Sequence, residues 1–259
     1  MTVDTERWAR YLIDAVDQRR EVAAITSRVD GFGVGDAYEV QREVLAARLA
    51  AGDRVAGAKL GLTSKAKQEQ MGVDEPAYGW LLASSVLGAG AELDTAELIH
   101  PRVEPEFVFV MGEDLAGEDV TADDVLDATE RVAGGIEVID SRYERFKFAL
   151  ADVIADNTSA ARVVVGPDGI APREVDLATV TCSFEIDGVE VARADGSALL
   201  GQPAHCVALL VHHLTRLGGK LEAGWTVLAG APTDAHALHP GSVVTARYSH
   251  FPAVGFRAV

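Results

Sequence analysis

Three glutamates interrupt two segments that otherwise have the composition of buried β-strands. Glu104 and Glu106 are two residues apart in the segment 101–110, in which Val103 and Phe107 mark an alternating apolar face. Because successive side chains of a strand point to opposite faces, both carboxylates leave the same face, with their attachment points about 7 Å apart. A sheet face seldom carries two anions, so we expect this face to border either a cavity or solvent.

Glu137 lies in the second segment, the apolar run 135–139. Burying an unpaired carboxylate there would be costly, so a neutralising partner is expected. Three carboxylates from two strands suit a hard divalent cation such as Mg²⁺ or Mn²⁺, which takes oxygen ligands and keeps positions open for water or substrate. The residues favour a metal site formed by Glu104, Glu106 and Glu137, and they leave a solvated acidic face as the alternative.

Lys59 lies between Gly57 and Gly61 on one face of a predicted strand, residues 55–62. Because these neighbours have no side chains, we expect room for a substrate beside the lysine. A lysine in a partly apolar pocket can pair with a substrate carboxylate or change its pKa toward a catalytic role. The alternative is a strand lysine that extends its ammonium group to solvent. We favour the functional interpretation.

Small polar side chains gather in the segment 155–159, directly before the apolar run 163–165. A loop that lines a site and an ordinary turn both use such residues. Ser141 and Glu144 fit a capping box that opens a helix, but Arg142 between them has no capping role.

Other site motifs are weak or missing in the sequence. The seven histidines include no i, i+4 pair, which argues against a histidine zinc site, and no glycine-rich phosphate loop or nucleophile elbow is present. Cys182 and Cys206 are too few for a disulfide framework or a thiolate metal cage. We therefore expect two buried, inert thiols.

The charge of the chain excludes some classes of partner. It carries 23 Lys plus Arg and 40 Asp plus Glu, a formal net charge of −17. Nucleic acids and anionic membrane surfaces are therefore not expected partners. No apolar run approaches the ~18 residues of a membrane span, and the first ten residues lack the basic and apolar regions of a signal peptide. We expect a cytoplasmic protein.

Hydrophobic periodicity predicts a mixture of helices and strands, with most strands after residue 100. Helices are predicted from residue 5 onward and over 36–50, 64–71, 121–132 and 203–217. Strands are predicted over 55–62, 103–109, 135–139, 180–186, 189–191, 225–228, 243–248 and 254–258, with a hairpin turn at residues 187–188. No internal repeat, low-complexity tract or long linker is present.

Four segments carry a resemblance to a known family. They are GAKLGLTSKAKQEQMGV (57–73), IHPRVEPEFVFV (99–110), GIEVIDSRYERFKF (135–148) and IADNTSA (154–160). In order and spacing they resemble the 2-keto-4-pentenoate hydratase and 4-oxalocrotonate decarboxylase group of the fumarylacetoacetate hydrolase superfamily, over roughly residues 36–259. The resemblance implies an α+β fold with a β-rich, mixed, barrel-like core of the fumarylacetoacetase C-terminal kind. We expect residues 1–72 to form a mainly helical segment with one strand, packed on a catalytic domain of residues 73–259.

The resemblance also implies roles for individual residues. Glu104, Glu106 and Glu137 are expected to bind Mg²⁺ or Mn²⁺. Lys59 and Ser159 are expected to be catalytic, and Arg142 and Asn157 to bind substrate. The expected partner is a small dicarboxylate substrate. A homo-oligomer and a complex with a vinylpyruvate hydratase are further expectations.

One position favours a decarboxylase within this group. Hydratases usually carry an aspartate in a P-D-[FY]-G segment, whereas this chain has Ala77 in Pro-Ala-Tyr-Gly, residues 76–79. The implied reaction is the decarboxylation of 2-oxohex-3-enedioate to 2-hydroxypenta-2,4-dienoate, in the meta-cleavage degradation of aromatic compounds. A dienoate hydratase, a non-catalytic scaffold for a hydratase and an acylpyruvate hydrolase are the alternatives. Residues 250–253, His-Phe-Pro-Ala, also replace a glycine-rich turn of the relatives.

Overall fold

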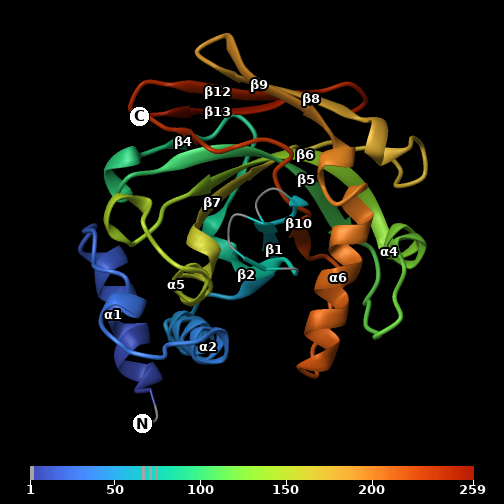
Figure 1. The fold of residues 1–259 in the computed structure, drawn as a ribbon. Helices are drawn as coiled ribbons and strands as arrows, with labels where there is room; N and C mark the ends of the chain where they lie inside the picture. The colour runs from blue at the N-terminus through green and yellow to red at the C-terminus, as the bar shows by residue number, and fades with distance from the viewer. Residues whose placement is uncertain (1–2, 66–67, 70–71, 74) are drawn as a thin grey trace.

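Two β-sheets and two groups of helices make up the fold (Figure 1). The structure is a computed structural model that describes residues 3–65, 68–69, 72–73 and 75–259. Part of the helix predicted over 64–71 therefore lies outside the described residues. The combination confirms the predicted α+β class.

The larger sheet has eight strands and carries the acidic segments. Its order is β2-β1-β10-β5-β6-β7-β3, and β11 pairs with β5. The bounds are β1 Val55–Gly61, β2 Ala77–Leu82, β3 Val86–Gly88, β5 Arg102–Met111, β6 Thr129–Ile139, β7 Ala160–Val165, β10 Thr226–Leu228 and β11 His236–Ala237. The end strands β2 and β3 are joined by the short turn η2, Ala83–Ser85, without pairing to each other in the described chain. The sheet is thus curled but is not a closed barrel.

The smaller sheet lies against the outer side of β5 and β6. Its order is β4-β13-β12-β8-β9, with bounds Glu92–Leu93, Val254–Ala258, Val243–Tyr248, Thr181–Ile186 and Val189–Asp195. Tyr248 connects the two sheets, because its hydroxyl donates to the carbonyl oxygens of Glu106 at 2.7 Å and Gly135 at 3.2 Å. A Cβ at residue 134 would lie 2.3 Å from the Tyr248 ring, which explains Gly134.

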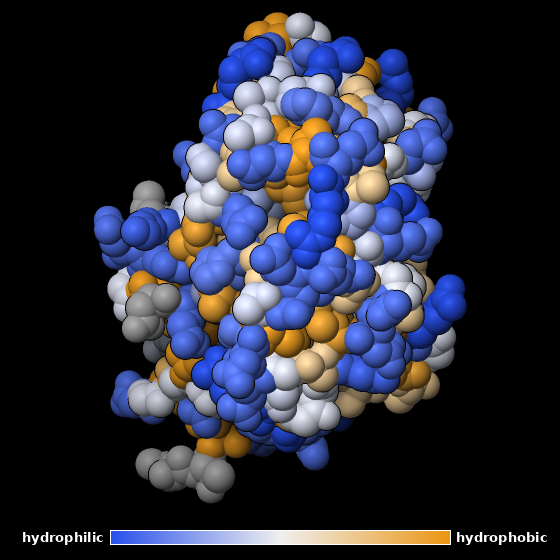
Figure 2. Space-filling view, turned by 90° about the vertical axis from the view of Figure 1, so that its right-hand side faces the viewer, coloured by the Kyte–Doolittle hydropathy of each residue, from blue (hydrophilic) through white to orange (hydrophobic). Residues whose placement is uncertain are grey.

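The helices flank the larger sheet on two sides (Figure 1). Helices α1 (Thr5–Asp17), α2 (Val34–Ala50) and α5 (Leu150–Ala155) form one group, and α4 (Ala122–Ala128) and α6 (Pro203–Arg216) form the other. No helix among the described residues is long and apolar enough to cross a membrane. On the face that includes α6, hydrophilic side chains separate the hydrophobic atoms into several groups (Figure 2).

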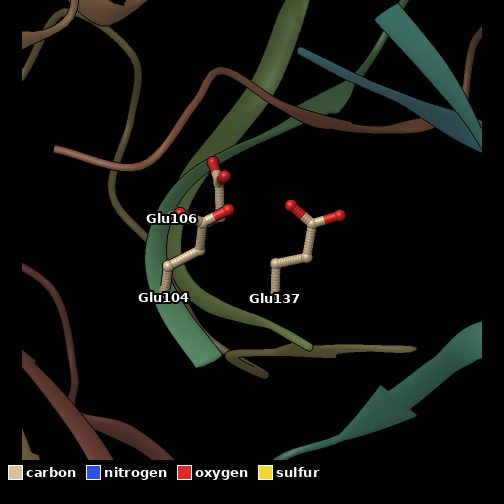
Figure 3. A group of neighbouring side chains, drawn as sticks. All are labelled: Glu104, Glu106 and Glu137. Atoms are coloured by element: carbon tan, nitrogen blue, oxygen red, sulfur yellow. The ribbon is translucent and has the colours of Figure 1, made fainter. Parts of the chain in front are cut away.

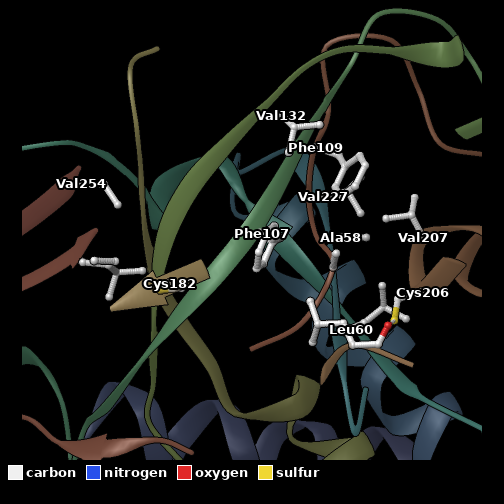
Figure 4. Packing of buried hydrophobic residues seen from close by; sticks show 14 of the residues in the cluster. Ala58, Leu60, Phe107, Phe109, Val132, Cys182, Cys206, Val207, Val227 and Val254 are labelled. Carbon is white, nitrogen blue, oxygen red and sulfur yellow. Dashed lines mark hydrogen bonds between the residues drawn. The ribbon is translucent and has the colours of Figure 1, made fainter. Parts of the chain in front are cut away.

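The main hydrophobic core joins the two sheets and α6 (Figure 4). Phe107 and Phe109 of β5 lie in it and are fully buried. Cys182 and Cys206 also belong to this core, so both thiols are buried as expected. Burial raises the pKa of each thiol to about 12, which keeps both protonated at neutral pH.

Several predicted elements are confirmed and others are wrong. The strands over 243–248 and 254–258 are confirmed, and so is the hairpin turn at 187–188. The helix predicted over 121–132 ends at Ala128, because the chain from Thr129 onward pairs with β5. The capping box at Ser141 opens no α-helix. Its hydroxyl instead accepts a hydrogen bond from the N–H of Tyr143 at 3.2 Å. The domain boundary after residue 72 stays a prediction.

Candidate metal centre

Glu104, Glu106 and Glu137 converge on one point in the structure (Figure 3). One carboxylate oxygen from each lies within 4.8 Å of the others. The register explains this convergence, because Glu104 on β5 pairs directly with Glu137 on β6, and Glu106 is the next residue on the same face. The exposed fractions are 8% for Glu104 and 0% for the other two residues. The solvated-face alternative is therefore wrong.

Glu106 shows how unfavourable this cluster is without a cation. Its Oε2 accepts a hydrogen bond from the N–H of Gly230 at 2.8 Å, but its buried Oε1 has no hydrogen-bond partner among the described residues. Burial raises the pKa of Glu106 well above its ordinary range, and the neighbouring charges of Glu137 and Glu104 raise it further. An oxygen left without a donor inside a three-carboxylate cluster fits the ligand set of a hard divalent cation.

Lys59 of β1 supplies the positive charge next to this cluster. Its Nζ lies 2.9 Å from Oε2 of Glu137 and donates to the carbonyl oxygen of Thr158 at 3.3 Å. Burial lowers the pKa of Lys59, but the charges of the three glutamates outweigh burial and raise it overall. The side chain is 3% exposed, so the alternative of a lysine extended to solvent is wrong.

The glycines beside Lys59 do not have the role that the sequence predicts. A Cβ at Gly57 would lie 1.7 Å from the carbonyl oxygen of Thr226 on the neighbouring strand β10. Gly57 therefore allows two strands to approach closely and leaves no room for a substrate. At Gly61 the nearest atoms belong to the side chain of Thr158, 3.9 Å from a Cβ. The expectation of open space on both sides of Lys59 is wrong at Gly57.

The polar segment after α5 lies beside Lys59. Asn157, Thr158 and Ser159 have positive φ values of 49°, 51° and 60°. This conformation is uncommon for residues with side chains, and for a β-branched threonine it is an outlier. The buried hydroxyl of Ser159 has no hydrogen-bond partner in the described part of the chain.

The polar groups of Arg142 and Asn157 are hydrogen-bonded to other parts of the protein. The backbone N–H and Nε of Arg142 donate to the carboxylate of Asp156, and its Nη1 donates to the carbonyl oxygen of Ala160 at 3.2 Å. The side-chain amide of Asn157 binds both backbone polar groups of Trp80. Arg142 and Asn157 line a cavity of about 310 Å³ next to α1 and α2, and none of the three glutamates lines it.

Ala77 lies on the same side of the β1–β2 pair as Lys59. The register pairs Lys59 with Gly79 and Gly61 with Ala77, so these four residues share one face of the two strands. The Ala77 side chain is buried. Ala77 is therefore two residues along β2 from Gly79, the residue that pairs with Lys59. Ala77 is also the position at which hydratases usually carry an aspartate.

Sequence reasoning missed two backbone groups that contact the site. Gly230 donates to Glu106, and its φ of 122° places a would-be Cβ 2.0 Å from Oγ1 of Thr63, so only glycine fits there. Thr158 contributes its carbonyl oxygen to Lys59. Backbone groups carry no residue-specific signal, and only the turn-like composition around these positions could have indicated them.

Comparisons with known proteins give the family of this chain. Residues 46–257 match the family described as fumarylacetoacetate (FAA) hydrolase C-terminal. The chain is 38% identical to a 4-oxalocrotonate decarboxylase of Pseudomonas sp. (strain CF600), over 97% of this chain and 95% of that protein. It is 42% identical to a 2-hydroxypent-2,4-dienoate hydratase of Pseudomonas putida, over 80% and 94%.

Solved structures are similar to this chain as well. The 4-oxalocrotonate decarboxylase from Pseudomonas putida G7, complexed with magnesium and adipate, superposes with a TM-score of 0.95 at 35% identity. The match covers 98% of this chain and 97% of that chain. The fumarylpyruvate hydrolase from Pseudomonas aeruginosa shares the fold, with a TM-score of 0.61 at 18% identity over 78% of this chain and 88% of that chain. This chain belongs to the fumarylacetoacetate hydrolase C-terminal family.

Proposed function

We propose that this protein is a metal-dependent carboxy-lyase that converts 2-oxohex-3-enedioate (4-oxalocrotonate) to 2-hydroxypenta-2,4-dienoate and CO₂. The observation that carries the proposal is Ala77, which shares a strand face with Lys59 and can neither accept nor donate a proton. Hydratases of the group usually have an aspartate at this position. Similarity to 4-oxalocrotonate decarboxylases over 97% of the chain supports the same choice.

The proposed cofactor is Mg²⁺ or Mn²⁺, bound by Glu104, Glu106 and Glu137. The buried Oε1 of Glu106 and the all-oxygen ligand set support a hard divalent cation. When bound, such a cation supplies a Lewis acid for the substrate oxygen on which negative charge develops.

The protein's own groups determine what happens to that charge. Loss of CO₂ breaks the C5–C6 bond, and the electron pair is delocalised through the C3–C4 double bond to the 2-oxo oxygen. Protonation of that oxygen gives the 2-hydroxydienoate. The buried ammonium of Lys59 stabilises the anionic substrate and transition state electrostatically. The hydroxyl of Ser159 is available to donate to a substrate oxygen.

Water addition to the product is disfavoured in this site. Hydration needs a group that moves a proton to or from water, and the methyl group of Ala77 cannot do this. Proton transfer by another residue would make the protein a dienoate hydratase, which is the second candidate. The 42% identity to a 2-hydroxypent-2,4-dienoate hydratase favours it.

The remaining roles stay predictions. These are substrate binding by Arg142, a homo-oligomer, a complex with a vinylpyruvate hydratase, and a cytoplasmic location. The place of the reaction in meta-cleavage degradation of aromatic compounds is part of the proposal.

Two assays on the purified protein test the proposal. With Mg²⁺ and 2-oxohex-3-enedioate, we expect release of CO₂ in proportion to the substrate consumed. With 2-hydroxypenta-2,4-dienoate, we expect negligible loss of the dienoate absorbance. Rapid hydration of the dienoate without release of CO₂ from the dicarboxylate would replace the decarboxylase proposal with the hydratase.

A further inference from the structure

The three-residue turn Asn157–Ser159 is held in an unfavourable backbone conformation next to the metal centre. All three residues have left-handed φ values and none is a glycine. Such strain persists only where surrounding contacts determine the conformation.

Asn157 is the residue that fixes the turn to the sheet. Its Oδ1 accepts from the N–H of Trp80 at 2.7 Å, and its Nδ2 donates to the carbonyl oxygen of Trp80 at 2.9 Å. The amide thus pairs with β2 as a neighbouring strand would. A Cβ at residue 79 would lie 2.5 Å from Oγ1 of Thr158 and 2.7 Å from the carbonyl oxygen of Asn157, so Gly79 lets the turn lie directly on the strand.

The turn places one group against Lys59 and carries the Ser159 hydroxyl one residue further on. The carbonyl oxygen of Thr158 accepts a hydrogen bond from Nζ of Lys59, and the same Nζ lies 2.9 Å from Glu137. The next residue is Ser159, whose buried hydroxyl has no partner among the described residues. A shift of the turn would therefore move the lysine contact and the hydroxyl together.

We propose that Asn157 is a positioning residue for Lys59 and Ser159, and that it acts through Thr158 without contacting the substrate. Both polar atoms of its amide are already bound to Trp80, which favours this role over substrate binding. Displacement of a reacting group by about 1 Å can cost about 100-fold in rate. The kinetic part of the proposal rests on the proposed decarboxylation, and the positioning part does not.

Gln41 provides a matched control. Its buried amide also connects β2 to the α5 region, because Nε2 donates to the carbonyl oxygens of Tyr78 at 2.9 Å and Ile154 at 3.0 Å. Among the described residues, the Gln41 amide has no hydrogen bond to the turn itself. Loss of the Gln41 amide should therefore lower stability without moving the Thr158 carbonyl.

The experiment compares Asn157→Asp, Asn157→Gly and Gln41→Ala in the full-length protein. Asn157→Asp keeps the size of the side chain but turns the donor to Trp80 into an acceptor. Asn157→Gly removes the amide and at the same time favours the left-handed φ, so it tests the contact without added strain if the first variant fails to fold. Circular dichroism and thermal melting report the folded state.

Two measurements are made on each variant. Steady-state kinetics with Mg²⁺ and 2-oxohex-3-enedioate separate kcat from KM. Nuclear magnetic resonance of protein labelled with ¹³C at lysine Cε, without metal or substrate, reports the surroundings of Lys59. The chain has five lysines, and the signal missing from Lys59→Met identifies Lys59.

We expect both Asn157 variants to lower kcat by about 100-fold, to change KM by less than about twofold and to shift the Lys59 signal. Gln41→Ala should lower the melting temperature but leave kcat and the Lys59 signal as in the wild type. Unchanged kcat and signal in the Asn157 variants, or equal effects of Gln41→Ala, would overturn the proposal. A raised KM at constant kcat would instead make Asn157 a substrate ligand. If the wild type releases no CO₂, the decarboxylase proposal is wrong, and the resonance data still decide the positioning role.

Discussion

Glu104 on β5 and Glu137 on β6 face each other directly across an antiparallel strand pair, and both side chains are buried. Like charges in this arrangement destabilise a sheet. Lys59 forms an ion pair with Glu137, and burial together with the two neighbouring carboxylates raises the pKa of Glu106. Placing these carboxylates opposite each other therefore lowers the stability of the metal-free protein. A bound cation would remove this loss.

The first prediction is that metal binding stabilises the protein. A ligand that binds only the native state at a hundred times its Kd adds about 2.7 kcal/mol to the free energy of unfolding. For a chain of this size, the melting temperature should rise by roughly 5 to 10 °C. Differential scanning calorimetry of chelator-treated protein, with and without Mg²⁺ or Mn²⁺, measures the shift. Equal melting temperatures with and without each ion would contradict the metal site.

The second prediction concerns Glu106→Gln. Because Glu106 is fully buried and one of its oxygens lacks a donor, removing its charge should stabilise the metal-free protein. The same change should weaken metal binding by more than the 10- to 100-fold typical of a residue that only supports a ligand. Titration calorimetry and chemical unfolding measure the two effects. Full metal affinity and full turnover in this variant would remove Glu106 from the site.

The third prediction concerns Lys59→Met. Loss of one partner from a buried ion pair typically costs about 3 to 5 kcal/mol, because the other charge stays buried. We expect this loss in the metal-free protein and a smaller loss when a divalent cation is bound near Glu137. Turnover should fall by orders of magnitude, as measured by CO₂ release. Near wild-type kcat would leave Lys59 with a structural role alone.

The fourth prediction is a pH dependence at His213 on α6. Its ring lies 4.2 Å from the ring of Tyr78, and its Nε2 has no hydrogen-bond partner in the described chain. Burial, helped by the charge of Arg216, lowers the pKa of His213 below 6.5. The unfolded chain therefore takes up a proton before the native state does, and stability falls as pH drops from about 6.5 through the lower native pKa.

Unfolding of the wild type and of His213→Phe between pH 5 and pH 8 checks this prediction. The wild type should lose stability relative to the variant on the acid side of pH 6.5, and the difference should be constant above it. His239→Phe, which changes an exposed histidine, is the control and should follow the wild type. A difference that does not vary with pH would contradict the assignment.

The alternation of a strand was enough to predict the acidic cluster. Glu104 and Glu106 had to share a face, and Glu137 stood out because it interrupts an apolar strand. A substrate site beside Lys59 stays a prediction, and the open space expected next to the lysine is absent at Gly57. Residue 57 must be a glycine because β10, about 170 residues later in the chain, lies directly against it. No local sequence pattern indicates such a contact.

The contacts of the polar segment 155–159 could not be predicted from the sequence for a similar reason. Asn157 has the composition of a turn residue, but its role depends on Trp80, which lies on a strand 77 residues earlier. The Ser141 segment matched a capping box, yet the backbone there is hydrogen-bonded to Val22 and Asp156 and opens no α-helix, only the 3-10 turn Glu144–Phe146. Local propensity was overridden in both places by contacts between distant segments.

The hydrogen bonds from Gly230 and Tyr248 also determine how much of the chain must be synthesised before Glu106 has its native contacts. Glu106 lies in the middle of the chain, but the N–H that binds its carboxylate and the hydroxyl that binds its backbone come from the last part of the sequence. A nascent chain that ends before these residues contains all three glutamates without the contacts that orient Glu106. Glu106 therefore has its native hydrogen bonds only after residues 230 and 248 have been added to the chain.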